Sequence, residues 1–163
     1  MQVNKQDFYY GAFYSVLIQR GIKPTLFDES KQGCIARFET DKSKYTVFIK
    51  YVQESTKPNA GRTEQLWHFN FSSEELQKIS DNVQPDAENC FVGVCATKDL
   101  MGSQIAVIKW EEAIQLLGSD SVNRQRRISV SNTKRKHGLL CYGTAKNRED
   151  GIWIKRDPNA TID

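Results

Sequence analysis

The first stretch of the chain carries apolar and aromatic side chains at the spacing of one helix face. These side chains are Phe8, Tyr9, Ala12, Phe13, Val16 and Leu17. An α-helix has about 3.6 residues per turn, so positions three and four apart share a face. The pattern predicts a helix over residues 5–20 that buries this face and ends at the signals Gly21 and Pro24.

Apolar runs in the rest of the chain are short, and they predict strands. Residues 34–40 and 44–52 are typical of a β-hairpin that turns at Asp41-Lys42-Ser43. A short strand at 25–27 and a polar turn at 28–33 precede this hairpin. The other predicted strands are 67–71, 90–96, 104–109, 128–130, 139–142 and 152–154.

Two further helices separate these strands. Ser72 and Glu75 have the spacing of a capping box, which predicts a helix from there to about residue 80. A second apolar pattern predicts a helix over 110–117 that ends at Gly118. The mixture of helices and strands predicts one α+β domain over residues 1–163, with a central mixed β-sheet and flanking helices.

Charge is distributed unevenly along this domain. Residues 118–163 hold ten Lys/Arg and five Asp/Glu, whereas residues 1–117 hold thirteen and fifteen. We therefore divide the domain into a core over 1–117 and a basic, β-rich extension over 118–163. A basic segment favours an anionic partner, with nucleic acid (DNA or RNA) the first expectation. The alternative is a basic surface that is only solvated.

The composition narrows the class of protein. Hydrophobic residues make up 39% of the chain and charged residues 26%, which are globular values and argue against general disorder. No apolar run approaches the roughly 20 residues of a membrane span, and the polar start is unlike a signal peptide. The four cysteines have no C-x-x-C spacing and are expected to be free thiols. We expect a cytoplasmic protein with no membrane partner.

Lys50 is the most informative single residue, because it interrupts the otherwise apolar or aromatic strand 44–52. A lysine in such a strand lies at an edge, extends its ammonium group to solvent, or has an anionic partner. The alternative is a lysine on an exposed strand face. The environment of Lys50 therefore decides whether it has a special role.

The helix, short strand, turn and hairpin over residues 8–52 resemble the restriction-endonuclease-like fold of the PD-(D/E)XK nuclease superfamily. They look like small bacterial domains of that superfamily, and the likeness covers residues 5–109. In that family an acid near the start of one hairpin strand and an (Asp/Glu)-x-Lys on its partner hold a divalent metal and activate water. The resemblance implies a catalytic role for Lys50.

The sequence departs from the family motif at two positions. The (Asp/Glu)-x-Lys position reads Phe48-Ile49-Lys50, and a phenylalanine cannot bind a metal ion. A three-residue turn sets Thr40 opposite Lys44, which predicts that Cys34 lies opposite Lys50, where the resemblance would place an acid. Only the lysine of the motif is matched.

Asp28 and Glu29, in the turn before the hairpin, are the carboxylates left to serve as metal ligands and catalytic acids beside Lys50. A hard cation such as Mg²⁺ needs several oxygen ligands. Two carboxylates make a working two-metal site doubtful, so we expect a lapsed active site with no cofactor, or Mg²⁺ if activity remains.

Basic residues flank the predicted strand 128–130 on both sides. Before the strand are Arg124, Arg126 and Arg127, and after it are Lys134, Arg135 and Lys136. If this strand pairs with the next as a hairpin, the two groups fall at opposite ends, some 15 Å apart by strand rise. That arrangement suits contact with a phosphate backbone. Tyr142 and Trp153 are candidates for stacking on bases, or for ordinary strand packing.

The sequence therefore predicts a nucleic-acid-associated domain that resembles a PD-(D/E)XK nuclease and has lost its active site. One alternative is an active metal-dependent nuclease that uses Asp28, Glu29 and Lys50. The other is a protein-interaction or accessory module whose basic end only keeps it soluble.

Overall fold

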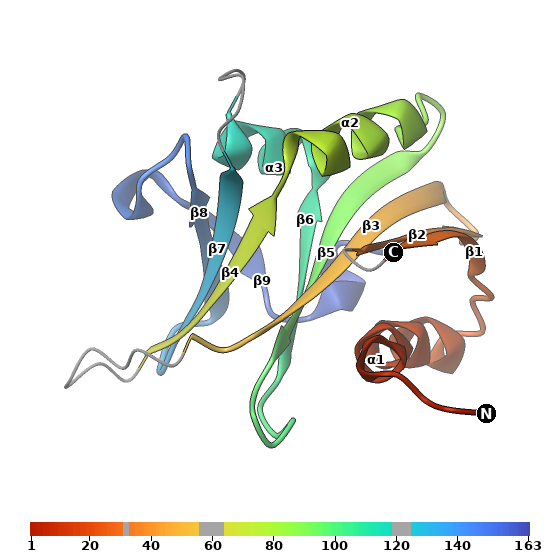
Figure 1. Ribbon diagram of the computed structural model, residues 1–163, viewed down its shortest axis with the longest axis horizontal. Helices are drawn as coiled ribbons and strands as arrows, with labels where there is room; N and C mark the ends of the chain where they lie inside the picture. Colours follow the sequence, from red (N-terminus) through yellow and green to blue (C-terminus); the bar gives the residue numbers. More distant parts are fainter. Residues whose placement is uncertain (31–32, 56–63, 119–124) are drawn as a thin grey trace.

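The described strands of the protein form two sheets (Figure 1). The computed structural model describes residues 1–30, 33–55, 64–118 and 125–163, with the backbone alone for 26–30. The five-stranded sheet has the order β1 (Thr25–Ser30), β2 (Gly33–Glu39), β3 (Lys44–Gln53), β5 (Glu88–Ala96), β6 (Gln104–Lys109). The four-stranded sheet has the order β4 (Glu64–Phe71), β7 (Arg126–Thr133), β8 (Gly138–Gly143), β9 (Ile152–Lys155).

Helices lie at three places among the described residues. They are α1 (Lys5–Gln19), α2 (Ser73–Asn82) and α3 (Trp110–Leu117), with short 3₁₀ turns η1 (Arg148–Asp150) and η2 (Pro158–Ala160). The predicted capping box at α2 is confirmed: Glu75 N donates to Ser72 Oγ at 3.1 Å, and Ser72 N donates to the Glu75 carboxylate at 2.9 Å. No helix in the described part of the chain has the length and apolar character needed to cross a membrane.

The five-stranded sheet is mixed, as the sequence predicts. β1, β2 and β3 are antiparallel neighbours, β3 pairs with β5 in parallel, and β5 pairs with β6 antiparallel. The parallel pair requires the chain to cross over between β3 and β5, and this crossover contains β4 and α2. The coarse class α+β with a central mixed sheet is therefore correct.

Successive side chains of the five-stranded sheet point into two different cores. Val47 of β3 faces α1 and packs with Phe13, whereas the next residue, Phe48, faces the four-stranded sheet. The two sheets approach closely at Gly93 of β5, where a Cβ atom would lie 2.7 Å from Cζ of Phe69 on β4. The five-stranded sheet is thus a central layer between α1 and the four-stranded sheet (Figure 1).

The β2–β3 hairpin forms as predicted, but its register differs by one residue. Glu39 rather than Thr40 pairs with Lys44, which leaves a four-residue connection. Thr40 is drawn into the turn because its Oγ1 accepts hydrogen bonds from the amides of Lys42 and Ser43, both at 3.2 Å. With this register Cys34 pairs with Ile49 and not with Lys50. Its side chain therefore lies on the face of the sheet opposite to that of Lys50.

The four-stranded sheet joins distant parts of the sequence. β4, from the predicted core segment 1–117, pairs along its whole length with β7, from the predicted extension 118–163. Ile162 near the end of the chain is fully buried in the α1 core, where its carbonyl accepts a hydrogen bond from Arg20. Strand pairing and core packing therefore join the predicted core segment 1–117 to the predicted extension 118–163.

Candidate functional site

Lys50 has an anionic partner. Its Nζ forms an ion pair with the Glu75 carboxylate, donates a hydrogen bond to the carbonyl of Asn70 at 2.7 Å, and lies 4.7 Å from the ring centroid of Phe71. The Lys50 and Glu75 side chains are only 13% and 16% exposed. The alternative of an exposed strand face is therefore wrong. Lys50 ties β3 to the start of α2, where Glu75 also caps the helix.

The positions that the nuclease motif would fill with acids are occupied by core side chains. Phe48 is 2% exposed and its ring centroid lies 5.4 Å from that of Trp110. Cys34 is buried on the α1 side, and the neighbour of Lys50 on β2 is Gly33. The hollow beside Lys50 has a volume of about 40 Å³, which suits a water molecule rather than a nucleotide.

Asp28 and Glu29 lie in β1 and not in a polar turn, which corrects the sequence interpretation. β1 continues to Ser30, with Asp28 paired to Ile35 and Glu29 paired to Cys34. Their side chains lie outside the described part of the structure, so their role as metal ligands stays a prediction. Among the described residues, no group of three His, Cys, Asp or Glu side chains is arranged to hold a metal ion.

The predicted basic residues that the structure describes lie at the two ends of β7. Arg126 donates from its guanidinium to the carbonyl of Gly118 at 2.8 Å, which fixes the end of α3. Arg127 is exposed. Arg124 lies outside the described residues. The other three, Lys134, Arg135 and Lys136, are exposed on the β7–β8 turn. β7 is longer than predicted, so the two ends are roughly 23 Å apart rather than 15 Å, at about 3.3 Å per residue.

Two basic residues beside this turn, Lys155 and Arg156, were not predicted from the sequence. The guanidinium of Arg156 donates to the carbonyl of Lys136 at 2.7 Å and to that of Thr133 at 3.4 Å, which braces the turn. Lys155 is exposed on β9 and pairs with Gly138 at the end of the same turn. A strand register is needed to find them, because they are about twenty residues from the turn in sequence.

The face of the four-stranded sheet that points away from the core is called here the outer face. By strand register it carries His68 and Asn70 of β4, Arg127 and Ser129 of β7, Tyr142 of β8, and Trp153 and Lys155 of β9. The residues between them, including Trp67, Phe69 and Ile154, are buried in the core. The outer face therefore combines aromatic rings with basic side chains and with one acid, Glu64 of β4, which forms an ion pair with Arg148.

The centre of the outer face is a hydrogen-bonded layer rather than a reactive centre. His68 Nδ1 lies 2.8 Å from Ser129 Oγ, and burial, followed by the charge of Arg127, lowers the pKa of His68. Ser129 is completely buried, so substrate cannot reach its hydroxyl. This Ser/His pair gives no support to nucleophilic catalysis, which needs an accessible nucleophile.

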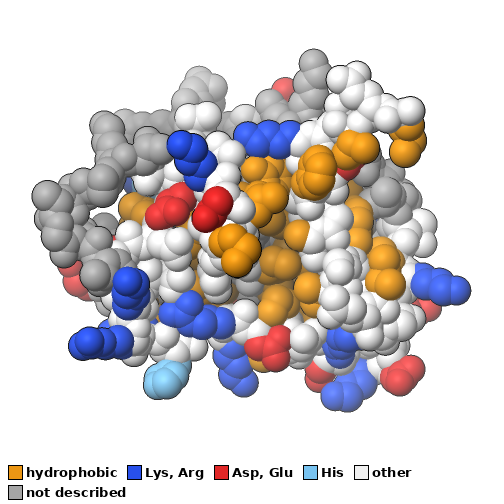
Figure 2. All heavy atoms as spheres, turned by 90° about the horizontal axis from the view of Figure 1, so that it is seen from below, with side chains coloured by type: hydrophobic (Ala, Val, Ile, Leu, Met, Phe, Trp, Pro, Cys, Tyr) orange, Lys and Arg blue, Asp and Glu red, His pale blue; other side chains and the backbone are white. Residues whose placement is uncertain are grey.

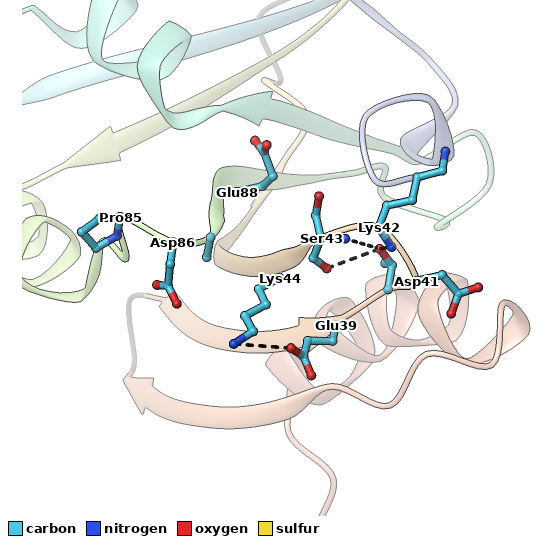
Figure 3. A pocket seen from close by; sticks show the side chains of 10 residues that line it. Glu39, Asp41, Lys42, Ser43, Lys44, Pro85, Asp86 and Glu88 are labelled. Atoms are coloured by element: carbon cyan, nitrogen blue, oxygen red, sulfur yellow. Dashed lines mark hydrogen bonds and ion pairs between the residues drawn. The ribbon is translucent and has the colours of Figure 1, made fainter.

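A wide hollow lies between the β2–β3 turn and the segment 85–88 (Figure 3). It has a volume of about 600 Å³ and is open to solvent. Its charges are mixed: Lys44 lies 3.7 Å from Glu39, and Lys42 pairs with Asp163 at 3.1 Å outside the hollow. Asp86 and Glu88 line it as well. With both signs interspersed, the hollow has no clear preference for an anion or a cation.

Comparisons of the chain with protein-family models, curated proteins and solved structures find no match.

Proposed function

We propose that this chain associates with nucleic acid through the β7–β8 turn and the outer face, and that the site around Lys50 is catalytically inactive. The observation that carries the proposal is the cluster of exposed cations at the turn, Lys134 to Lys136, with Lys155 beside it. Arg156 holds the turn backbone in place. When Lys and Arg side chains contact phosphates, they displace the cations condensed on the nucleic acid, and the release of these cations favours binding.

The positions of the basic groups suit a chain of phosphates better than a single phosphate. The turn and Arg127 mark the two ends of β7, and the polar outer face lies between them. Contacts to phosphate position a nucleic acid without reading its sequence. We therefore expect binding with little sequence preference and a strong dependence on salt.

The environment of Lys50 supports the inactive site. In the restriction-endonuclease-like fold that this chain resembles, the lysine works beside acids and a metal ion. Here Glu75 and the Asn70 carbonyl engage Lys50, and Phe48 stands in the hydrophobic core. A helix before a hairpin, and a strand parallel to the hairpin, are compatible with a relation to that fold. We expect no cleavage of DNA or RNA with Mg²⁺ or Mn²⁺.

The interaction-module alternative has its own observation. Apolar side chains are exposed on α1 and on the β5–β6 turn, among them Phe8, Ile18 and Met101. Figure 2 shows hydrophobic side chains over the middle of the face seen from below. Hydrophobic side chains gathered on one face are typical of a protein contact. None of these three residues lies on the basic turn, so a failure of nucleic-acid binding would leave this alternative in first place.

The test is binding of fluorescent DNA and RNA oligonucleotides at several salt concentrations. We expect a log–log salt slope of about −2 to −4, at roughly −0.9 per phosphate contact on duplex DNA and −0.7 on a single strand. The K134A/R135A/K136A variant should bind all sequences more weakly and show a flatter slope. The matched control K5A/K23A/K98A removes the same charge from exposed positions elsewhere and should change binding less. Absence of binding at about 50 mM salt would refute the proposal.

A further inference from the structure

Trp153 is the one tryptophan of this chain that solvent reaches. It is 54% exposed, whereas Trp67 and Trp110 are buried. It lies on β9, the edge strand of the four-stranded sheet, and its pairing partner on β8 is Leu140. Its ring leans along the sheet, because a Cβ atom on Gly138 would lie 3.4 Å from Cε3 of Trp153. Gly138 therefore leaves room for an indole that lies over the strands with one side open.

Positive charge lies on one side of this indole, toward the β7–β8 turn. Lys155 lies two residues further along β9 on the same face, and its partner Gly138 begins β8 directly after the basic turn. Arg156 links β9 to that turn through the Lys136 carbonyl. Figure 2 shows Lys and Arg side chains gathered at the edge of the molecule where the β7–β8 turn lies in Figure 1.

A second aromatic ring lies further along the outer face. Tyr142 is two residues beyond Leu140 on β8, which places it about 8 Å from Trp153 by strand rise and strand spacing. The guanidinium of Arg148 lies 5.8 Å from the centroid of the Tyr142 ring. The exposed acids Glu149 and Asp150 follow Arg148 in η1, whereas the β7–β8 turn carries Lys134, Arg135 and Lys136, so phosphates are favoured on the side of the turn.

We propose that the outer face binds single-stranded nucleic acid, with one base stacked on Trp153 and the adjoining phosphates held by Lys155 and the β7–β8 turn. This inference rests on the proposed nucleic-acid association and names the form of nucleic acid that the site takes. The bases of a duplex are already stacked and cannot offer a face to an indole. In a single strand each base has a free face, and stacking on an aromatic side chain contributes about 1–3 kcal/mol per base.

The experiment measures the affinity of the full chain for unstructured single-stranded 20-mers, as DNA and as RNA, and for the matching duplexes. Replacing Trp153 with alanine should weaken single-strand binding by about 5- to 150-fold and leave duplex binding within about two-fold. Trp153→Phe should retain part of the affinity because it keeps an aromatic face. Ile114→Ala, at an exposed position on α3, is the control and should change neither.

Tryptophan fluorescence supplies a second readout, since Trp153 dominates the solvent-accessible signal. Adding the single strand should quench it, and quenching by acrylamide should fall. Circular dichroism and Tm should stay unchanged in Trp153→Ala, because the side chain lies on an exposed edge strand. Equal binding of duplex and single strand, with no effect of Trp153→Ala, would overturn this inference and leave the proposed function intact. Absence of any binding would overturn both.

Discussion

Replacing Lys50 with methionine should destabilise the protein without any loss of a chemical activity. Methionine keeps the apolar stem but removes the ammonium group, so Glu75 loses its partner and the Asn70 carbonyl loses a donor. Breaking a fully buried ion pair costs about 3–5 kcal/mol. Since both side chains retain some exposure, we expect about 2–3 kcal/mol, or a fall in Tm of about 4–12 °C for a chain of this size.

A double-mutant cycle shows whether this loss comes from the pair. Glu75→Gln should also destabilise the protein, because its single amide oxygen can accept from Ser72 N only by turning the amide NH2 group toward the Lys50 ammonium. The combined variant should be more stable than the sum of the two losses predicts, by about 1–2 kcal/mol. The control is Lys44→Met, whose pair with Glu39 is 3.7 Å long with both side chains more than half exposed, and it should cost under about 0.5 kcal/mol.

Thermal and urea unfolding, followed by circular dichroism, measure all four variants. If Lys50→Met melts within about 2 °C of the wild type, the ion pair does not hold Lys50. The lysine would then be available for chemistry, and the active-nuclease alternative would gain support. Cleavage assays with Mg²⁺ or Mn²⁺ on the same samples test that alternative directly.

Two further results are expected from the packing of the cores. Gly93→Ala should cost about 1–3 kcal/mol in urea unfolding, because its methyl group would meet the Phe69 ring where the two sheets approach; an unchanged urea midpoint would show that Phe69 can move aside. Burial raises the pKa of Cys90 to about 12, so its thiol stays protonated at pH 8. All four cysteines are buried, so Ellman's reagent should react slowly with the native protein and promptly in urea; rapid native labelling would contradict the packing.

Local patterns in the sequence predict the individual elements well. Apolar spacing locates α1, and the capping box locates the start of α2, because both depend on residues within one or two turns. The predicted buried face of α1 is wrong at Phe8 and Ala12, which are exposed, because the helix turns Tyr10 into the core instead. The alternation of Trp67, Phe69 and Phe71 correctly places all three in the core. Such patterns show which face of a strand is buried, but they do not show which strand is its neighbour.

The errors in the candidate site come from contacts between distant residues. The hairpin register shifted because the Thr40 side chain bonds within the turn, and this decides what lies opposite Lys50. The partner of Lys50 is Glu75, twenty-five residues later, and the capping box indicated only its helical role. The place of Lys155 beside the basic turn depends on the pairing of β8 with β9.

The pairing of β4 with β7 has a consequence for the order in which the protein folds. The innermost pair of this ladder is Phe71 with Arg126, so the ladder closes a loop of about 54 residues (72–125), and contacts of such long range slow folding. During synthesis from the N-terminus, β4 leaves the ribosome well before its partner exists. Its aromatic residues and its unpaired backbone then face solvent, which leaves this strand open to wrong pairing and to capture by a chaperone.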